Sequence, residues 1–118
     1  MMTPVTLKNL TKHDIRLVFG STTLTIPPSG HVARTTGDNQ ELVDIISYEG
    51  YEVPVYKWTS SNVKELPEPK DGTVYLTSGV IAQIVKRPDV MCPNTSPHSI
   101  VRDVYGNKIG VKSLITYR

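Results

Sequence analysis

The amino-acid sequence predicts an α+β fold in which a mainly antiparallel β-sheet is accompanied by one or two short helices. Short runs of β-branched and aromatic residues recur along the chain between turn residues. Two-residue turns join three pairs of these runs, at Gly20-Ser21, Glu49-Gly50 and Gly106-Asn107. The segment after Leu76 has apolar residues at the spacing of a helix. At 118 residues the chain fits one domain, residues 1–118, large enough to bury a core.

The first third of the chain predicts several strands. Residues 5–10 alternate modestly, and residues 15–19 and 22–26 are two β-prone runs on either side of the first turn. The sequence Pro27-Pro28-Ser29-Gly30 then ends strand pairing, because proline has no amide hydrogen to donate. We expect residues 31–36 to form a further strand.

Residues 41–48 fit either a helix or a strand, and we favour the strand. Several of their residues are β-branched, and the Glu49-Gly50 turn leads into another β-prone run, 51–58. Pro54 lies inside that second run, which is typical of an edge strand or a bulge. The two runs are therefore predicted to pair around a tight connection.

The centre of the chain predicts a strand that leads into a capped helix. Residues 74–76 are an extended apolar run, and Ser78 then offers a side-chain oxygen to the free N–H groups of a helix. The next apolar residues have the spacing of one helical stripe: Val80, Ile81, Ile84 and Val85. Pro88 ends the helix at or before Arg87. We expect a polar loop bracketed by prolines to follow, and then a hairpin of residues 99–105 and 108–117.

Charge and cysteine content exclude several classes of protein. Thirteen Lys and Arg residues against eleven Asp and Glu give a formal charge of +2, so we expect no DNA partner. Cys92 is the single cysteine, so it forms no disulfide within the chain and no zinc site with the histidines. No apolar stretch reaches the ~18 residues of a membrane span, and the chain begins without the regions of a secretory signal. We expect an intracellular protein without a membrane partner.

The motifs of common enzymes are missing from the chain. Cys92 lies beside Val90 and Met91, which favours a buried, inert thiol over a nucleophile served by His98. No Gly-x-Ser-x-Gly elbow and no phosphate-cradling Gly-x-x-x-x-Gly-Lys occurs. The carboxylates are scattered, mostly in turns where capping is the default role. We therefore expect no enzymatic activity and no cofactor or metal.

Polar residues around the helix are the best candidates for a binding site. The free N–H groups at the helix start, near Ser78, suit an anion such as a phosphate. The loop after the helix adds Asn94 and Thr95, and the next strand contains Arg102 and Asp103. An arginine held by a neighbouring carboxylate can bind an anionic ligand in a fixed pose, and a local ion pair is the equal alternative.

Arg34 and Arg87 are outlying candidates for binding a phosphate. Arg34 comes directly after His31-Val32-Ala33 in a predicted strand, and a guanidinium binds phosphate bidentately, but an ordinary surface arginine is the alternative. Arg87 lies four residues after Gln83, on the helix face opposite the apolar stripe. Gln83 and Arg87 are expected to face solvent unless a second subunit covers them.

Segments along nearly the whole chain resemble a small family of phage and prophage proteins. They are Asn9-Leu10-Thr11-Lys12-His13-Asp14-Ile15, Ile26-Pro27-Pro28-Ser29-Gly30 with Ala33-Arg34, Leu66-Pro67-Glu68-Pro69 with Gly72-Thr73-Val74-Tyr75, Ala82-Gln83, and Val101-Arg102-Asp103 with Gly106 and Gly110. These are turn and packing patterns. On these segments the chain resembles the family that includes the phage-encoded Thoeris anti-defence sponge of the first type.

The resemblance implies a non-enzymatic protein that acts in the cytoplasm of the bacterial host. Such sponges bind cyclic ADP-ribose isomers made by bacterial TIR-domain enzymes, and some also sequester cyclic oligonucleotides of the CBASS system at separate sites. They assemble as dimers and hexamers with pockets between subunits. The resemblance points to Asn94 as the loop asparagine and to Arg102 as a C-terminal arginine of the pocket. The family's aromatic contact near the helix end has no counterpart, because Ile84 and Val85 occupy that region.

We therefore expect a homo-oligomer that holds a cyclic nucleotide without cleaving it. The expected ligand contacts are Ser78, Asn94, Thr95, Arg102 and Asp103, with Arg34 and Arg87 as outlying phosphate partners. Sequestration needs hydrogen-bond donors and cations, but no nucleophile or base. A small domain with one helix has little room for a deep pocket, so a site between copies is favoured. The alternatives are a virion structural or assembly protein and an enzyme that cleaves the same signals.

Overall fold

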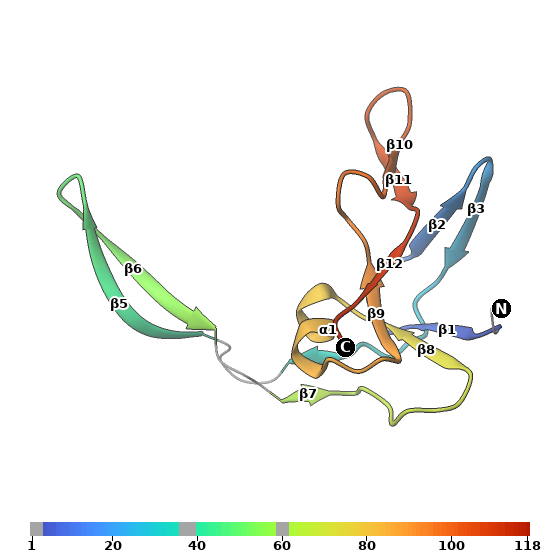
Figure 1. Ribbon diagram of the computed structural model, residues 1–118, viewed down its shortest axis with the longest axis horizontal. Helices are drawn as coiled ribbons and strands as arrows, with labels where there is room; N and C mark the ends of the chain where they lie inside the picture. Colours follow the sequence, from blue (N-terminus) through green and yellow to red (C-terminus); the bar gives the residue numbers. More distant parts are fainter. Residues whose placement is uncertain (1–3, 36–39, 59–61) are drawn as a thin grey trace.

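The computed structural model describes residues 4–35, 40–58 and 62–118, in which two four-stranded sheets, two two-stranded sheets and one short helix make an α+β structure (Figure 1). The strands outnumber the helix, as the sequence predicts. A long hairpin extends away from the rest of the molecule. With the hairpin included, the molecule measures 54 × 40 × 28 Å along its principal axes. Each sheet is built from short runs of the kind that the sequence indicates.

The first sheet has the strand order β1 (Thr6–Asn9), β8 (Thr73–Leu76), β9 (Val90–Pro93) and β12 (Leu114–Thr116). Strand β8 pairs in parallel with both β1 and β9, whereas β9 and β12 are antiparallel. The helix α1 (Gly79–Val85) connects β8 to β9, since parallel neighbours need a crossover rather than a tight turn. The prediction of a polar loop after Pro88 is therefore wrong at β9, where Val90 and Cys92 are buried.

The second sheet has the order β10 (Ile100–Arg102), β11 (Lys108–Val111), β2 (Ile15–Phe19) and β3 (Thr22–Ile26). The predicted hairpin β2–β3 is confirmed with its Gly20-Ser21 turn, and Gly20 adopts positive φ there. Strands β10 and β11 pair as predicted, but β10 ends at Arg102, so the predicted two-residue Gly106-Asn107 connection is wrong and residues 103–107 form the turn. The run 108–117 divides into two strands, because β12 pairs with β9 of the first sheet.

Three of the strand pairings are parallel, so the expectation of a mainly antiparallel sheet is corrected to mixed sheets. The parallel pairings are β1 with β8, β8 with β9, and β11 with β2. Two of them join strands that are far apart in the sequence. Hairpin turns reveal antiparallel neighbours only, which is why the sequence pattern overstated that arrangement.

The ends of α1 agree with the sequence prediction. The Ser78 hydroxyl accepts a hydrogen bond from the Ile81 N–H at 3.4 Å, which satisfies one free donor of the first turn. Lys86 has left-handed backbone and donates its N–H to the Ala82 carbonyl, so the helix ends before Arg87. Ile81 and Ala82 are buried, whereas Val80 is exposed, so the buried stripe is displaced from the predicted one. Arg87 lies beyond the helix and shares no helical face with Gln83.

The main core lies between α1 and the first sheet. It consists of Leu10, Ala33, Tyr75, Ile81, Ala82, Val90 and Cys92. Burial raises the pKa of the Cys92 thiol, which therefore stays protonated at neutral pH. The expectation of a buried, inert Cys92 fits this environment.

Asn9 is a buried polar residue that ties three segments together. Its side-chain amide donates to the carbonyls of His13 at 2.8 Å and Ile26 at 2.9 Å. Its side-chain oxygen accepts from the N–H of Thr11 at 2.9 Å and from the Thr11 hydroxyl at 2.7 Å. Because all of these polar atoms are paired, Asn9 can be buried with 1% of its surface exposed.

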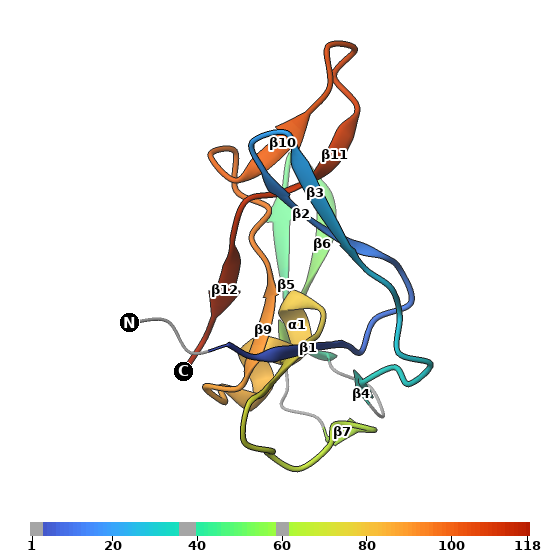
Figure 2. The ribbon, with the colours of Figure 1, turned by 90° about the vertical axis from the view of Figure 1, so that its right-hand side faces the viewer.

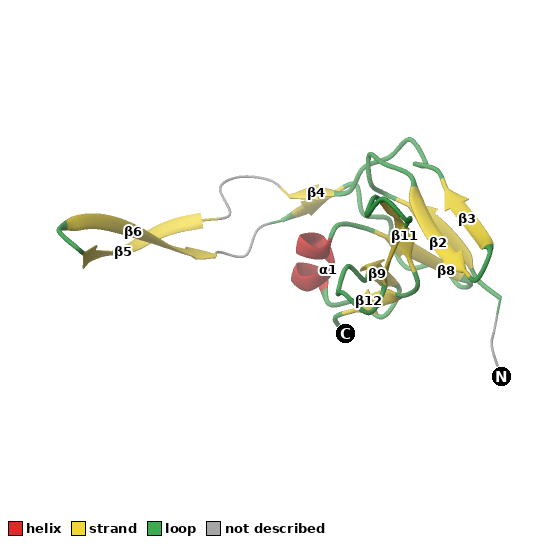
Figure 3. Ribbon diagram, turned by 90° about the horizontal axis from the view of Figure 1, so that it is seen from above, coloured by secondary structure: helices red, strands yellow, loops and turns green. Residues whose placement is uncertain are grey.

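The extended hairpin consists of β5 (Gln40–Tyr48) and β6 (Tyr51–Trp58) and is called the arm below; the remaining elements are called the body. Its strands confirm the choice of strand over helix for residues 41–48. At its base β4 (Arg34–Thr35) pairs with β7 (Val63–Lys64), so the predicted strand 31–36 is short, and residue 36 lies outside the described residues. Figures 1 and 3 show the arm reaching away from the body. In Figure 2 the β10–β11 turn and the β4–β7 pair lie at opposite ends of the body.

Candidate functional site

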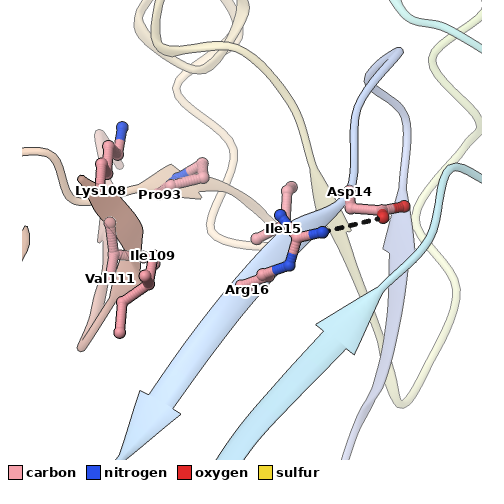
Figure 4. Close-up of a pocket in the computed structure, with 8 residues that line it drawn as sticks. Asp14, Ile15, Arg16, Pro93, Lys108, Ile109 and Val111 are labelled. Atoms are coloured by element: carbon pink, nitrogen blue, oxygen red, sulfur yellow. Dashed lines mark hydrogen bonds and ion pairs between the residues drawn. The ribbon is translucent and has the colours of Figure 1, made fainter. Parts of the chain in front are cut away.

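A half-open cleft with two cationic side chains lies where β2, β9 and β11 meet (Figure 4). Its volume is about 240 Å³. The residues that line it are Asp14, Ile15, Arg16, Pro93, Lys108, Ile109, Gly110 and Val111. Ile15 and Val111 are buried and form an apolar base, and Arg16 and Lys108 supply positive charge. An apolar base with a few charged groups is typical of small-ligand sites.

Gly110 allows the two walls of this cleft to approach each other. Strands β11 and β2 pair in parallel, with Val111 opposite Leu17. A Cβ atom on Gly110 would lie 2.7 Å from the Arg16 carbonyl oxygen and 2.8 Å from a methyl carbon of Val18. Glycine is therefore needed here for close backbone packing, and this packing sets the distance between the Arg16 and Lys108 walls.

The charges of the cleft favour an anion. Arg16 is joined to Asp14 by one contact of 3.5 Å between a guanidinium nitrogen and a carboxylate oxygen, and both side chains are about half exposed. An exposed pair of this length is weak. A phosphate has a planar edge of two oxygens that a guanidinium binds bidentately, so it can displace this contact. Lys108 adds a second positive charge from the opposite wall.

Arg102 lies beside this cleft. It is the cross-strand partner of Lys108 in the β10–β11 ladder, next to an irregularity in the register. Its guanidinium donates to the Gly106 carbonyl at 2.9 Å, and the residue is exposed. Arg102 does not itself line the cleft, but it lies on β10, after the predicted loop, and pairs with the lining residue Lys108.

Asp103 shapes the β10–β11 turn. One carboxylate oxygen accepts from the N–H groups of Tyr105 and Asn107, each at 2.9 Å, and the other accepts from the Asn107 side chain at 3.2 Å. The backbone hydrogen bond from Asn107 is the main reason why the pKa of Asp103 is lowered. These bonds give Asp103 a structural role in the turn, which differs from both alternatives that the sequence left open, an ion pair with Arg102 and a carboxylate that holds Arg102 for a ligand.

Asn94 follows the cleft residue Pro93, but its side chain bonds inward. Its amide donates to the Ser113 hydroxyl at 3.1 Å, and its oxygen accepts from the N–H of Ser96 at 3.1 Å and from the Ser96 hydroxyl. Asn94 is buried, with 9% of its surface exposed, whereas Thr95 is exposed. The predicted loop therefore reaches the cleft, although the asparagine amide holds the loop to Ser113.

The other predicted contacts lie away from the cleft. Ser78 caps α1, and Arg34 is exposed with its nearest carboxylate, Glu65, at 3.9 Å. Arg87 donates to both Asp89 oxygens at 2.9 and 2.6 Å and to the Pro67 carbonyl at 3.1 Å. The hydrogen bond to Asp89 raises the pKa of Arg87, and the same bond lowers the pKa of Asp89. Through the Pro67 carbonyl, this arginine connects the turn before β9 to the segment between β7 and β8.

Sequence reasoning missed Arg16 and Lys108. Arg16 is the one charged residue in an apolar strand, which indicates a side chain that faces outward. Lys108 follows a hairpin turn, where charged residues are common. Neither signal says that the two residues face one cleft, because that depends on the parallel pairing of β2 with β11.

A larger cleft of about 390 Å³ is lined by residues of β1, β8 and the segment 26–29, and includes Lys8 and Lys70. Its lining includes no arginine and none of the predicted ligand contacts that follow the helix, Asn94, Thr95, Arg102 and Asp103. A third cleft, of about 280 Å³, is lined by Lys8 and His31 together with Glu65, Leu66 and Pro67, which lie between β7 and β8. The β2–β11 cleft is the better candidate for phosphate because it combines a guanidinium with an ammonium.

Within the described parts of the chain, no three His, Cys, Asp or Glu side chains gather closely enough to hold a metal ion. No helix in those same ranges has the length and apolar character that crossing a bilayer requires. Comparison with protein-family models, with curated proteins and with solved structures finds no match to this chain.

Proposed function

We propose that this protein binds and sequesters cyclic nucleotide signals, in the cytoplasm of a bacterial host, as a homo-oligomer of the phage anti-defence type. The ligands would be cyclic ADP-ribose isomers from TIR-domain enzymes and, as a second class, cyclic oligonucleotides of the CBASS system. The observation that supports this proposal best is the cleft whose lining includes both Arg16 and Lys108, together with the buried apolar residues Ile15 and Val111. The pyrophosphate would bind the two cations, and the apolar base would contact a ribose or a base.

The volume of the cleft argues for a site completed by a second copy. Pockets for small ligands typically enclose about 300–1,000 Å³, and this cleft has about 240 Å³ and is open on one side. A cyclic dinucleotide or cyclic ADP-ribose would protrude from it. Arg102 is exposed and pairs with the lining residue Lys108, so it would then contact the protruding part, and the exposed Thr95 remains a proposed contact from the loop after Pro93.

The ionisable groups of the cleft suit binding rather than cleavage. Asp14 is its one carboxylate, and that group is paired with Arg16. A pyrophosphate bound to Arg16 and Lys108 would meet no cysteine, serine or histidine among the residues that line the cleft. We therefore propose that the ligand is held intact.

Isothermal titration with a cyclic ADP-ribose isomer tests this proposal, with linear ADP-ribose as the comparison ligand. Arg16→Ala and Lys108→Ala should each weaken binding by at least about tenfold, since each removes a charge-assisted phosphate contact. Lys70→Ala, in the larger cleft, is the matched control. Loss of binding in the control alone would move the site to that cleft, and the absence of binding by any cyclic nucleotide would remove the function.

Chromatography of the ligand released by heat completes the test. Intact ligand is the expected result, because sequestration leaves every bond in place. A linear or hydrolysed product that accumulates with time, and that the Asp14→Asn variant no longer makes, would show an enzyme that cleaves the same signals.

A virion structural or assembly protein is the second candidate, and the arm favours it. Strand β5 is exposed along its whole length, and among the described residues the arm pairs with no strand of another sheet. Extended arms of this kind join subunits in large assemblies as readily as in small ones. A closed oligomer of a few subunits would favour the sequestering protein, whereas open polymerisation would favour the assembly protein.

A further inference from the structure

The arm exposes more apolar surface than a solitary chain of this size can be expected to leave in water. Its eight exposed large apolar residues are Leu42, Val43, Ile45, Ile46, Tyr48, Tyr51, Val53 and Tyr56. Ile45 is 54% exposed and Tyr51 is 75% exposed. An isolated two-stranded hairpin is at best marginally stable in water, so it needs a surface on which to pack.

The surface and size of the whole chain give the same indication. Its accessible surface is 8530 Å², whereas a compact monomer of the same mass, 13.1 kDa, exposes about 6,400 Å². Its radius of gyration is 17.6 Å, against about 13.5 Å for a compact domain of this length. The difference of about 2,100 Å² per chain is as large as one partner's share of an extensive, stable interface between subunits.

The apolar residues of the arm occupy both of its faces. Cross-strand partners lie on the same face, and successive pairs alternate between the two. One face has the pairs Tyr48–Tyr51 and Ile46–Val53 near the turn, and the other has Ile45–Pro54 and Leu42–Tyr56. A flat surface such as a lipid bilayer would cover one face only. A partner that surrounds the arm covers both.

The charge of the arm identifies the kind of partner. Residues 40–58 contain four carboxylates, those of Glu41, Asp44, Glu49 and Glu52, and the single cation Lys57, which gives a formal charge of −3. Since the whole chain has a formal charge of +2, the other residues have +5. The acidic arm of one copy is therefore complementary to the basic body of another.

From the exposed area, the two apolar faces and the opposite charges, we infer that the arm docks onto the body of a second copy of this chain and joins the subunits of the homo-oligomer. This inference rests on the oligomer of the proposed function but not on its ligand. If each copy both gives and receives an arm, two copies close a symmetric dimer and a cyclic series closes a larger ring.

Sedimentation of full-length variants tests the arm directly. Ile46→Thr/Val53→Thr alters one face and Leu42→Thr/Tyr56→Thr the other, and threonine preserves the β propensity of the strands. Wild type should sediment as a multiple of 13.1 kDa. Each double variant should raise the dissociation constant of the oligomer by about tenfold or more, because it removes apolar contacts at the centre of the interface.

Val104→Thr is the matched control, since Val104 is 93% exposed but lies in the β10–β11 turn. This variant should associate as wild type does. A wild-type protein that sediments as a 13.1 kDa species at every concentration up to its solubility limit would overturn the inference. Arm variants that associate as tightly as the control would also overturn it.

Hydrogen exchange of the arm amides identifies the occupant independently. Amides of a hairpin in water exchange fast, so protection of residues 40–58 should rise with protein concentration when a second copy covers them. Protection that appears only after addition of anionic vesicles would assign the arm to a membrane and overturn the inference. Titration with the cyclic nucleotide is a separate measurement, so loss of ligand binding with an intact arm interface would refute the proposed function alone.

Discussion

Gly110 lies directly against the backbone carbonyl of Arg16, and a Cβ atom at residue 110 would be 2.7 Å from that oxygen. This contact joins the C-terminal hairpin to β2, the strand that supplies the cationic wall of the cleft. The packing of one glycine therefore determines both the stability of the second sheet and the shape of the candidate site.

Gly110→Ala should lower the free energy of unfolding by about 2–4 kcal/mol, because the new methyl group meets backbone that cannot move without breaking the β2–β11 pairing. Urea unfolding at fixed protein concentration measures this loss. Gly79→Ala is the control, since its Cβ would meet its nearest neighbours at 3.9 Å in the first turn of α1. That substitution should be neutral or stabilising. Equal losses in both variants would contradict the close approach at Gly110.

Asn9→Ala should cost about 3 kcal/mol or more of unfolding free energy. The variant leaves the carbonyls of His13 and Ile26 and the N–H of Thr11 without their partner in a buried site. Thr11→Val removes only the hydroxyl bond to Asn9 and should cost about 1 kcal/mol. Chemical denaturation of both variants measures the difference, and a cost for Asn9→Ala no greater than that for Thr11→Val would show that Asn9 is not the centre of this network.

Asn94→Ala and Arg102→Ala should differ in stability even if both weaken ligand binding. Asn94 is buried and bonded to Ser113 and Ser96, so its loss should cost about 1–3 kcal/mol. Arg102 is exposed, and its loss should change stability by less than about 0.5 kcal/mol. Thermal unfolding distinguishes the two. A destabilised Arg102→Ala would mean that Arg102 supports the fold rather than a ligand.

The Arg87–Asp89 pair should make stability depend on acidic pH. The hydrogen bond from Arg87 lowers the pKa of Asp89 below its usual value of about 3.9. The pair therefore stabilises the fold above about pH 4, and this contribution is lost as the pH falls through the lowered pKa. Arg87 stays charged throughout, since its own pKa is raised.

Asp89→Asn measures this contribution. At pH 7 the variant should be about 1–2 kcal/mol less stable than wild type, because it loses a charge-assisted pair whose side chains are only 24% and 19% exposed. The difference should shrink as the pH falls through the lowered pKa of Asp89, because protonation removes the carboxylate charge from the pair. A difference of unfolding free energies that stays constant from pH 7 to pH 2 would contradict the ion pair.

The sequence predicts the local parts of this fold well. The β2–β3 and β10–β11 hairpins, the arm and the Ser78 cap all depend on residues within a few positions of one another. The β1–β8 and β2–β11 pairings bring together distant segments, and neither leaves a turn motif to recognise. For the same reason the sequence did not reveal Arg16 and Lys108 as a pair. Asn94 was predicted as a ligand contact because its loop is polar, but in the structure its side chain bonds to Ser113. Local chemistry reveals turns and caps, and the assembly of the cleft depends on tertiary packing.

The parallel pairing of β1 with β8 joins segments that are synthesised far apart in time. During translation the first strand stays without its partner until the ribosome has passed Leu76, whereas the two strands of the arm follow each other directly around Glu49-Gly50. A structure with such distant contacts has high contact order and folds slowly relative to helical domains of the same size. On a nascent chain, the hairpin can therefore form before the N-terminal sheet.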